Sequence, residues 1–113
     1  MNMTSLKSWF LSQTDAERIV FIMKLMHELT VNFRYFTTLS DTALLLIAAS
    51  KFNELNHRLT AYTLAILKQS PHYPDEIIFD MIEGTLTDPK LQPYVQHTVQ
   101  EVTKFAAAQG MSR

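Results

Sequence analysis

The side chains best suited to chemistry lie together in one short segment, Asn53 to Arg58. The segment holds a carboxylate, an imidazole, a guanidinium and two amides, which are groups that can move a proton, hold a metal ion or hydrogen-bond a ligand. At helical spacing, Asn53, Asn56 and His57 project from one side of a helix. Two interpretations stay open for these three side chains: a hydrogen-bonded network that fixes helix register or a subunit contact, and a ligand-binding or catalytic site.

Charged groups accompany this segment on another side of the same predicted helix. Glu54 and Arg58 have the i, i+4 spacing of an exposed helical ion pair, which is worth about 0.3–0.5 kcal/mol. An earlier segment holds a similar set of polar side chains: His27, Glu28, Asn32 and Arg34. If the two segments are antiparallel helices joined by a short connection, we expect the two polar sets to come near one another.

Metal binding needs more ligands than this segment offers. Glu54 and His57 form one Glu-x-x-His, whereas the di-iron sites of helix bundles use two such motifs and two further glutamates. His27, His57 and His97 fall in three different predicted helices, but no spacing requires them to converge on a zinc ion. We predict no metal and no cofactor. No Walker loop or dinucleotide fingerprint occurs, so an enzyme is not favoured, although acid–base catalysis by His57 and Glu28 is one hypothesis.

Composition indicates the elements that must position these side chains. The 113 residues are 47% hydrophobic and 19% charged, which is typical of one globular domain spanning residues 1–113. Only 2 glycines occur, so tight hairpins should be scarce and helices are favoured. With no cysteine, the chain can form no disulfide and no thiolate metal site. The predicted fold is an all-α, single-domain bundle of four main helices plus a short N-terminal helix.

Capping residues and prolines predict the limits of these helices. Thr14 and Glu17 form a capping box, so a helix should run from Asp15 to about Phe36. Its apolar stripe should comprise Ile19, Ile22, Met26, Leu29 and Phe33. The later signals are Pro71 and Pro74 in a stiff connection, Pro74 at a helix start, Gly84 at that helix's end, and Asp88–Pro89 before the last helix.

The second helix is predicted to run from Thr42 to about Gln69, capped by Ser40 or Asp41. It has apolar residues on two sides. The main stripe comprises Leu44, Ala48, Phe52, Leu55, Leu59, Tyr62 and Ile66, and the second comprises Leu46, Ala49, Leu64 and Leu67. Such a helix is either central in a bundle or shared with a second subunit.

Part of this helix resembles a phosphoacceptor segment. Glu54 to Leu67, ELNHRLTAYTLAIL, is similar to the phosphoacceptor box of one branch of sensor histidine kinases, where a Glu-Leu-x-His-Arg stretch begins a dimerising helix. The resemblance implies that His57 is the phosphorylated histidine and Glu54 its neighbouring acid. It also implies a phosphotransfer module that another protein serves, because the chain shows no glycine-rich phosphate loop of its own.

Three further motifs resemble those of small uncharacterised helical bacterial proteins. They are a His-Glu-Leu-Thr followed by an arginine (27–34), Asn-Glu-Leu-Asn-His-Arg (53–58), and Tyr-Pro-Asp (73–75). This resemblance implies a helical architecture and the same polar residues, and it brings no activity with it.

Charge and architecture together favour a binding role. A formal net charge of -1 offers few phosphate contacts, so we do not expect nucleic acid as a partner. No membrane span and no signal-peptide pattern is recognisable, so we expect a cytoplasmic protein that does not bind membranes. We predict a small bacterial-type binding or regulatory module that forms a homodimer through the second face of the Thr42–Gln69 helix and can also take another protein as partner. The alternative is a histidine phosphotransfer protein that uses His57.

Overall fold

The computed structural model describes residues 3–36 and 41–111, and the predicted all-α fold is confirmed. No strand occurs within these two ranges. In chain order the elements are α1 (Met3–Ser12), α2 (Asp15–Phe36), α3 (Thr42–Leu67), α4 (Asp75–Leu86), the 3-10 helix η1 (Pro89–Leu91) and α5 (Gln92–Ala108). Among the described residues, no helix is both long enough and apolar enough to cross a membrane.

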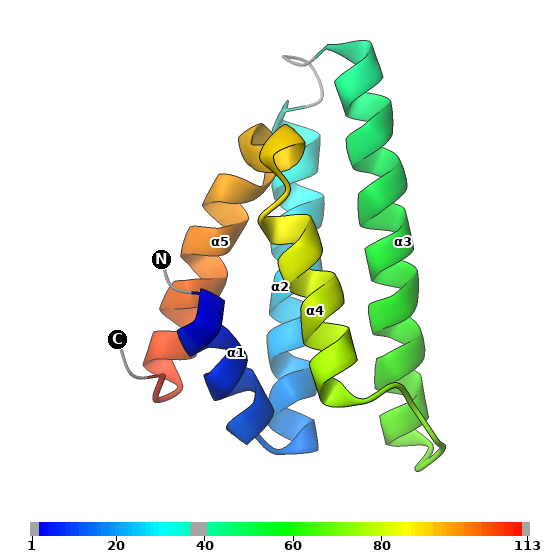
Figure 1. The fold of residues 1–113 in the computed structure, drawn as a ribbon, viewed down its shortest axis with the longest axis vertical. Helices are drawn as coiled ribbons and strands as arrows, with labels where there is room; N and C mark the ends of the chain where they lie inside the picture. The colour runs from blue at the N-terminus through cyan, green and yellow to red at the C-terminus, as the bar shows by residue number, and fades with distance from the viewer. Residues whose placement is uncertain (1–2, 37–40, 112–113) are drawn as a thin grey trace.

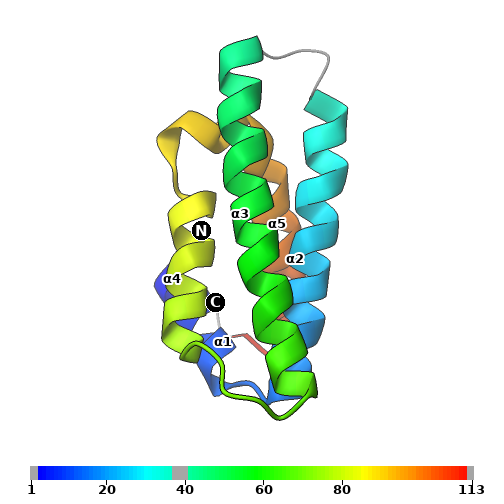
Figure 2. The same ribbon diagram turned by 90° about the vertical axis from the view of Figure 1, so that its right-hand side faces the viewer.

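The four longer helices run alternately up and down around a shared core (Figure 1). α2 packs most extensively against α5, and α3 packs mainly against α4. Figure 2 shows α3 in front of α5, with α2 on one side and α4 on the other. α1 lies across the lower part of the bundle, against α4 and α5 (Figure 1). One side of α3 therefore faces the core, and the opposite side faces away from the other helices.

Predicted caps begin α2 and α3. The Glu17 N–H donates to the Thr14 hydroxyl and the Thr14 N–H donates to the Glu17 carboxylate, both at 3.2 Å, which confirms the capping box. The Asp41 carboxylate accepts from the backbone N–H groups of residues 43 and 44 at 2.9 and 3.1 Å. Asp41 is thus the cap of α3, and Ser40, the other predicted cap, lies outside the described residues.

α3 ends two residues before the predicted Gln69 because the chain turns into a left-handed conformation there. Gln69 has φ 54°, its N–H donates to the Ile66 carbonyl at 3.0 Å, and the Ser70 N–H donates to the Ala65 carbonyl at 2.8 Å. These two bonds form a Schellman motif, in which glycine usually occupies the left-handed position. With a glutamine there, the backbone bears a strain of about 1–2 kcal/mol.

Gly84 does not end α4, so that prediction is wrong. The helix continues to Leu86, and the Thr87 N–H still donates to the Glu83 carbonyl at 2.9 Å. A glycine ends a helix when it takes positive φ, and Gly84 does not do so. It lies on the exposed side of α4, where an added Cβ would meet no atom within 4 Å.

The core confirms the main stripe of α3 and corrects that of α2. Ala48, Phe52, Leu55, Leu59 and Tyr62 are buried, and Leu44 and Ile66 are partly buried. On α2 the buried residues are Arg18, Phe21, Ile22, Leu25, Leu29 and Asn32, whereas the predicted Ile19, Met26 and Phe33 are only partly covered. The buried face of α2 is rotated from the predicted stripe because α5 covers this helix more extensively than α3 does.

Candidate functional site

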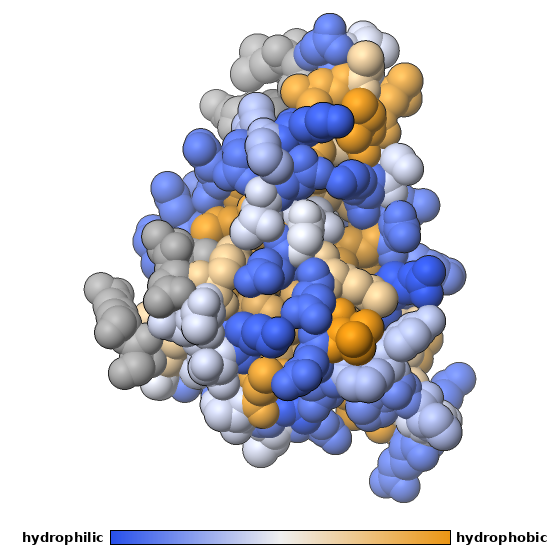
Figure 3. All heavy atoms as spheres, viewed as in Figure 1, coloured by the Kyte–Doolittle hydropathy of each residue, from blue (hydrophilic) through white to orange (hydrophobic). Residues whose placement is uncertain are grey.

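The side of α3 that faces away from the bundle carries six exposed residues in a regular series. They are Leu46, Ser50, Asn53, His57, Thr60 and Leu64, and we call them the outer stripe. Leu46 is 66% exposed and Leu64 is 47% exposed, and Leu67, at the end of the helix, is 66% exposed. Figure 3 shows hydrophobic surface gathered over the upper end of the molecule, where α3 begins. The second apolar side predicted for this helix is therefore open to solvent in a single copy.

The outer stripe contains two of the three side chains for which the sequence left two interpretations open. Asn53 and His57 are exposed, and Asn56 is half-buried towards one edge. The Asn56 Oδ1 is inaccessible to solvent, yet it has no hydrogen-bond partner among the described residues. Within the described ranges, no hydrogen bond joins these three side chains to one another, so the predicted network does not form among the described residues. A role in a subunit contact stays a prediction.

Arg58 pairs with a different residue from the one predicted. Its Nη1 donates to the Tyr73 hydroxyl at 3.0 Å, and the guanidinium carbon lies 5.9 Å from the centre of the Tyr73 ring. Within the described part of the chain, no ion pair joins Glu54 to Arg58. The predicted pair is wrong because the connection between α3 and α4 brings Tyr73 against the guanidinium. Glu54 is exposed.

The polar residues of α2 do not join those of α3. His27 and Arg34 are exposed, and Glu28 accepts from Lys24 Nζ at 2.9 Å on its own helix. Asn32 is buried and donates to the Thr98 hydroxyl on α5 at 2.7 Å. α2 and α3 do run antiparallel (Figure 1), but their polar side chains point to different sides, so the expectation that the two polar sets come near one another is wrong. In the described ranges, no three His, Asp or Glu side chains come together as metal ligands would, so His27, His57 and His97 do not converge.

A buried charged cluster, which the sequence did not reveal, ties the lower ends of three helices together. Arg18 of α2 is only 7% exposed, and its Nη2 lies 3.4 Å from Asp75 Oδ2 at the start of α4. The guanidinium also donates to the Asp15 carboxylate and to the Gln13 carbonyl. Tyr62 of α3, 1% exposed, donates its hydroxyl proton to Asp75 Oδ1.

Electrostatics in this cluster keep the tyrosine protonated. Burial, together with the hydrogen bond to Asp75, raises the pKa of Tyr62 well above its ordinary value. The sequence contains one signal for this cluster: Arg18 lies one helical turn before the core residue Ile22, on the side of α2 that is buried. It did not offer the identity of the partners, because Tyr62 and Asp75 approach Arg18 only once three helices have packed.

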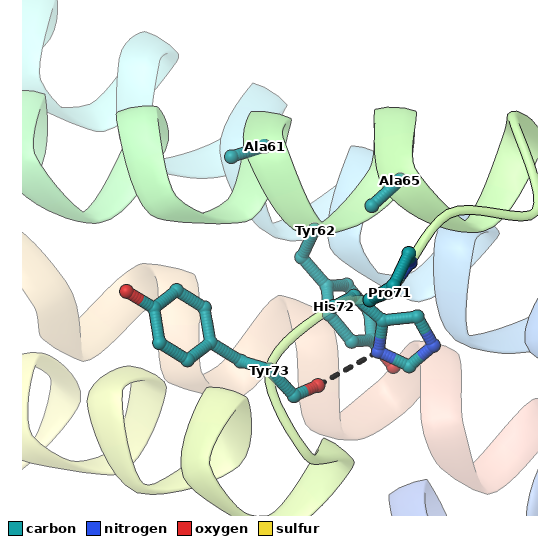
Figure 4. A pocket seen from close by; sticks show the side chains of 6 residues that line it. All are labelled: Ala61, Tyr62, Ala65, Pro71, His72 and Tyr73. Atoms are coloured by element: carbon teal, nitrogen blue, oxygen red, sulfur yellow. Dashed lines mark hydrogen bonds between the residues drawn. The ribbon is translucent and has the colours of Figure 1, made fainter.

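A shallow pocket of about 360 Å³ lies beside this cluster, between α3 and the connection to α4. Figure 4 shows Ala61 and Ala65 on α3 above it, and Pro71, His72 and Tyr73 from the connection below. The His72 ring meets the Tyr62 ring edge-on, with centroids 5.1 Å apart. His72 Nδ1 lies 2.7 Å from the Tyr73 carbonyl oxygen, and because a carbonyl oxygen only accepts, Nδ1 is the donor of this hydrogen bond.

A second hollow of about 300 Å³ continues between α3 and α4, on the far side of Arg58. Its polar lining comes from Lys51, Glu54, Arg58 and Thr85. Lys51 forms an ion pair with Asp88, and this hydrogen bond lowers the pKa of Asp88. Because its cations already have partners and a carboxylate lies between them, the hollow is not arranged as an anion site. Glu54 and Arg58 thus border both this hollow and the outer stripe.

Comparisons of this chain with protein-family models, with curated proteins and with solved structures found no match. The candidate functional site is therefore defined by geometry alone: the outer stripe of α3, with Glu54 and Arg58 along the edge that faces α4.

Proposed function

We propose that this chain is a small helical protein-interaction module that forms a homodimer through the outer stripe of α3. The exposure of Leu46 and Leu64 at the two ends of the outer stripe, and of Leu67 next to it on the same helix of 26 residues, carries this proposal. Fully burying one exposed leucine side chain stabilises a protein by about 1.5–3 kcal/mol. Because these three side chains are 66%, 47% and 66% exposed, an interface that covered them would gain about half of that from each. A helix whose exposed side is apolar at both ends is suited to receiving another helix.

The test is to measure mass against concentration by light scattering and analytical ultracentrifugation, from about 1 µM to about 1 mM. We expect a monomer–dimer equilibrium that Leu64→Asp shifts to monomer. Val31→Asp is the matched control, because Val31 is also a large exposed aliphatic residue but lies on α2. It should leave the equilibrium unchanged. A native chain that stays monomeric throughout this range would rule out the homodimer.

A second candidate function is histidine phosphotransfer through His57. Its imidazole is exposed in the middle of α3 and makes no hydrogen bond to another described residue. An acceptor histidine needs such exposure because an imidazole nitrogen must reach the phosphorus of a partner's phosphoaspartate or phosphohistidine. The phosphoryl group would then move to that nitrogen, and the partner's carboxylate or imidazole would leave. The similarity of Glu54–Leu67 to a phosphoacceptor box supports the same residue.

The two functions compete for one surface, since a dimer through the outer stripe covers His57. Phosphotransfer is tested by incubating the chain with phosphorylated response-regulator and histidine-kinase domains. Acid-labile label is expected on the native chain and on His97→Gln, whose histidine is also exposed but lies on α5, and not on His57→Gln. Absence of label on the native chain would exclude phosphotransfer from these donors. Label that persists in His57→Gln would exclude His57 as the acceptor.

A further inference from the structure

We propose that two copies of the chain pair antiparallel along the outer stripe of α3, about a two-fold axis at the level of Leu55 along the helix, so that Asn53 of each copy hydrogen-bonds His57 of the other. This pairing rests on the proposed homodimer and specifies its partner, orientation and register. In an antiparallel pair centred on residue 55, a residue five positions before the centre lies opposite the residue five positions after it.

The order of residue types along the outer stripe is the same in both directions. Leu46 and Leu64 stand nine positions before and after Leu55, and both are apolar. Five positions from the centre are the small hydroxyl residues Ser50 and Thr60, and two positions from it are Asn53 and His57. In an isologous interface, each contact of residue i with residue j is repeated as a contact of j with i, so the surface must be complementary to itself. In this register each stripe residue faces one of similar character, which meets that requirement.

The spacing of the outer stripe is that of a helix that packs along a second helix. Successive members are 4, 3, 4, 3 and 4 positions apart, which is a heptad spacing that keeps a seam on one side. All six side chains are exposed, and the seam spans about 27 Å at 1.5 Å per residue. The amide of Asn53 can donate to an imidazole nitrogen, or its oxygen can accept the imidazole N–H, so the polar centre of the seam satisfies itself.

Charge complementarity favours the antiparallel orientation. None of the six stripe residues is an Asp, Glu, Lys or Arg, and Glu54 and Arg58 lie along the edge that borders α4. A two-fold axis perpendicular to both helices brings like edges together. Glu54 then lies within about 3 Å, measured along the helix, of the level of Arg58 in the other copy, and the contact occurs twice.

A parallel pair would lack this complementarity. It would set the α4 edge of one helix against the α2 edge of the other. The residues along the α2 edge carry no charge: they are Leu45, Ala49, Asn56 and Thr63. Glu54 would then gain no cation, and His57 would face His57. In the antiparallel pair, by contrast, Glu54 of each copy lies near Arg58 of the other. The Arg58 guanidinium can keep its bond to Tyr73 at the same time, because it has further N–H groups.

Cysteine cross-linking tests the orientation directly, because the native chain contains no cysteine. Two single variants, Ser50→Cys and Thr60→Cys, are oxidised separately and as an equal mixture. In the proposed register, position 50 lies opposite position 60 of the other copy. Two copies of position 50 are separated by about 15 Å along the helix, which is beyond the reach of a disulfide. We expect a covalent dimer from the mixture alone, composed of one chain of each variant.

The control is Gln96→Cys, an exposed position on α5 that reports cross-linking by random collision. Ser50→Cys that cross-links efficiently to itself would show a parallel pair and overturn the proposal. A dimer by light scattering that yields no disulfide in the mixture would overturn the register while leaving the homodimer in place. A monomer by light scattering would overturn both.

Discussion

The two polar groups of this protein differ in how many helices hold them. Arg18, Tyr62 and Asp75 come from α2, α3 and α4, and their hydrogen bonds and ion pairs are made within one copy of the chain. Asn53 and His57 come from α3 alone and are exposed. A buried charge needs fixed partners, since leaving it unpaired is costly, whereas exposed amides and imidazoles bond to water until another surface replaces it. The first group therefore stabilises the fold, and the second is available for binding.

The largest expected effect is that of Asp75→Ala. This change leaves the Arg18 guanidinium buried without its α4 partner and the Tyr62 hydroxyl without an acceptor, so we expect the free energy of unfolding to fall by about 3 kcal/mol. Urea denaturation followed by circular dichroism measures it. The control is Asp80→Ala, on the exposed side of α4, where the ion pair to Lys7 is worth less than about 1 kcal/mol. Equal losses from the two variants would contradict a special role for the buried cluster.

The next comparison is between a buried and an exposed asparagine. Asn32→Ala leaves the fully buried Thr98 hydroxyl without its partner, and we expect a loss of about 2 kcal/mol in the free energy of unfolding. Asn53→Ala, measured at a concentration where the chain is monomeric, should change it by less than about 0.5 kcal/mol. If Asn53→Ala were as destabilising as Asn32→Ala, the outer stripe would have a structural role within one copy.

High pH should weaken the buried cluster through Tyr62. Its pKa is raised in the folded chain, so the folded state holds this proton more tightly than the unfolded state does. The resulting stability is complete below the ordinary tyrosine pKa of about 10 and is lost as the pH rises towards the folded value. We expect the free energy of unfolding to fall by up to about 1.4 kcal/mol per pH unit in that range.

Tyr62→Phe should remove this component of the pH dependence, and Tyr73→Phe, at an exposed position, should keep it. Denaturation midpoints at pH 9 and above, with phenolate absorbance followed in parallel, give the answer. A profile unchanged by Tyr62→Phe would show that another group is responsible.

Local chemistry explains which features could be predicted from the sequence. A capping box such as Thr14–Glu17 requires only residues three positions apart, and the buried stripe of α3 follows from periodicity in one helix. The buried face of α2 was not predictable in the same way, because apolar residues surround much of that helix. Which of them become buried depends on α5.

Contacts that form only in the folded bundle decide where the polar residues of α3 lie. The sequence places Glu54 and Arg58 at ideal spacing, but the connection after α3 brings Tyr73 to the guanidinium, and this contact takes the place of the local pair. Asn53 and His57 lie between apolar residues in the sequence, a pattern that fits both a central helix and a helix shared with a second subunit. Their exposure follows from the arrangement of the bundle, in which none of the described helices covers that side of α3 (Figure 2).

Reversing the charge of Glu54 or of Arg58, beside the outer stripe, should change the stability of the monomer least of all these variants. It should nevertheless change dimerisation clearly. Glu54→Arg puts two cations opposite each other at both Glu54–Arg58 contacts of the proposed pair, which lie near its centre, and Arg58→Glu does the same with two anions. Each variant alone should weaken dimerisation several-fold, because like charges across an interface are unfavourable. Mixing the two variants restores a pair of opposite charges at both contacts, so the mixture should form heterodimers about as stable as the native dimer.

Since both residues are on the surface, Glu54→Arg should change the free energy of unfolding of the monomer by less than about 0.5 kcal/mol. Heterodimers measured by sedimentation that are no more stable than either variant alone would show that these edges do not meet.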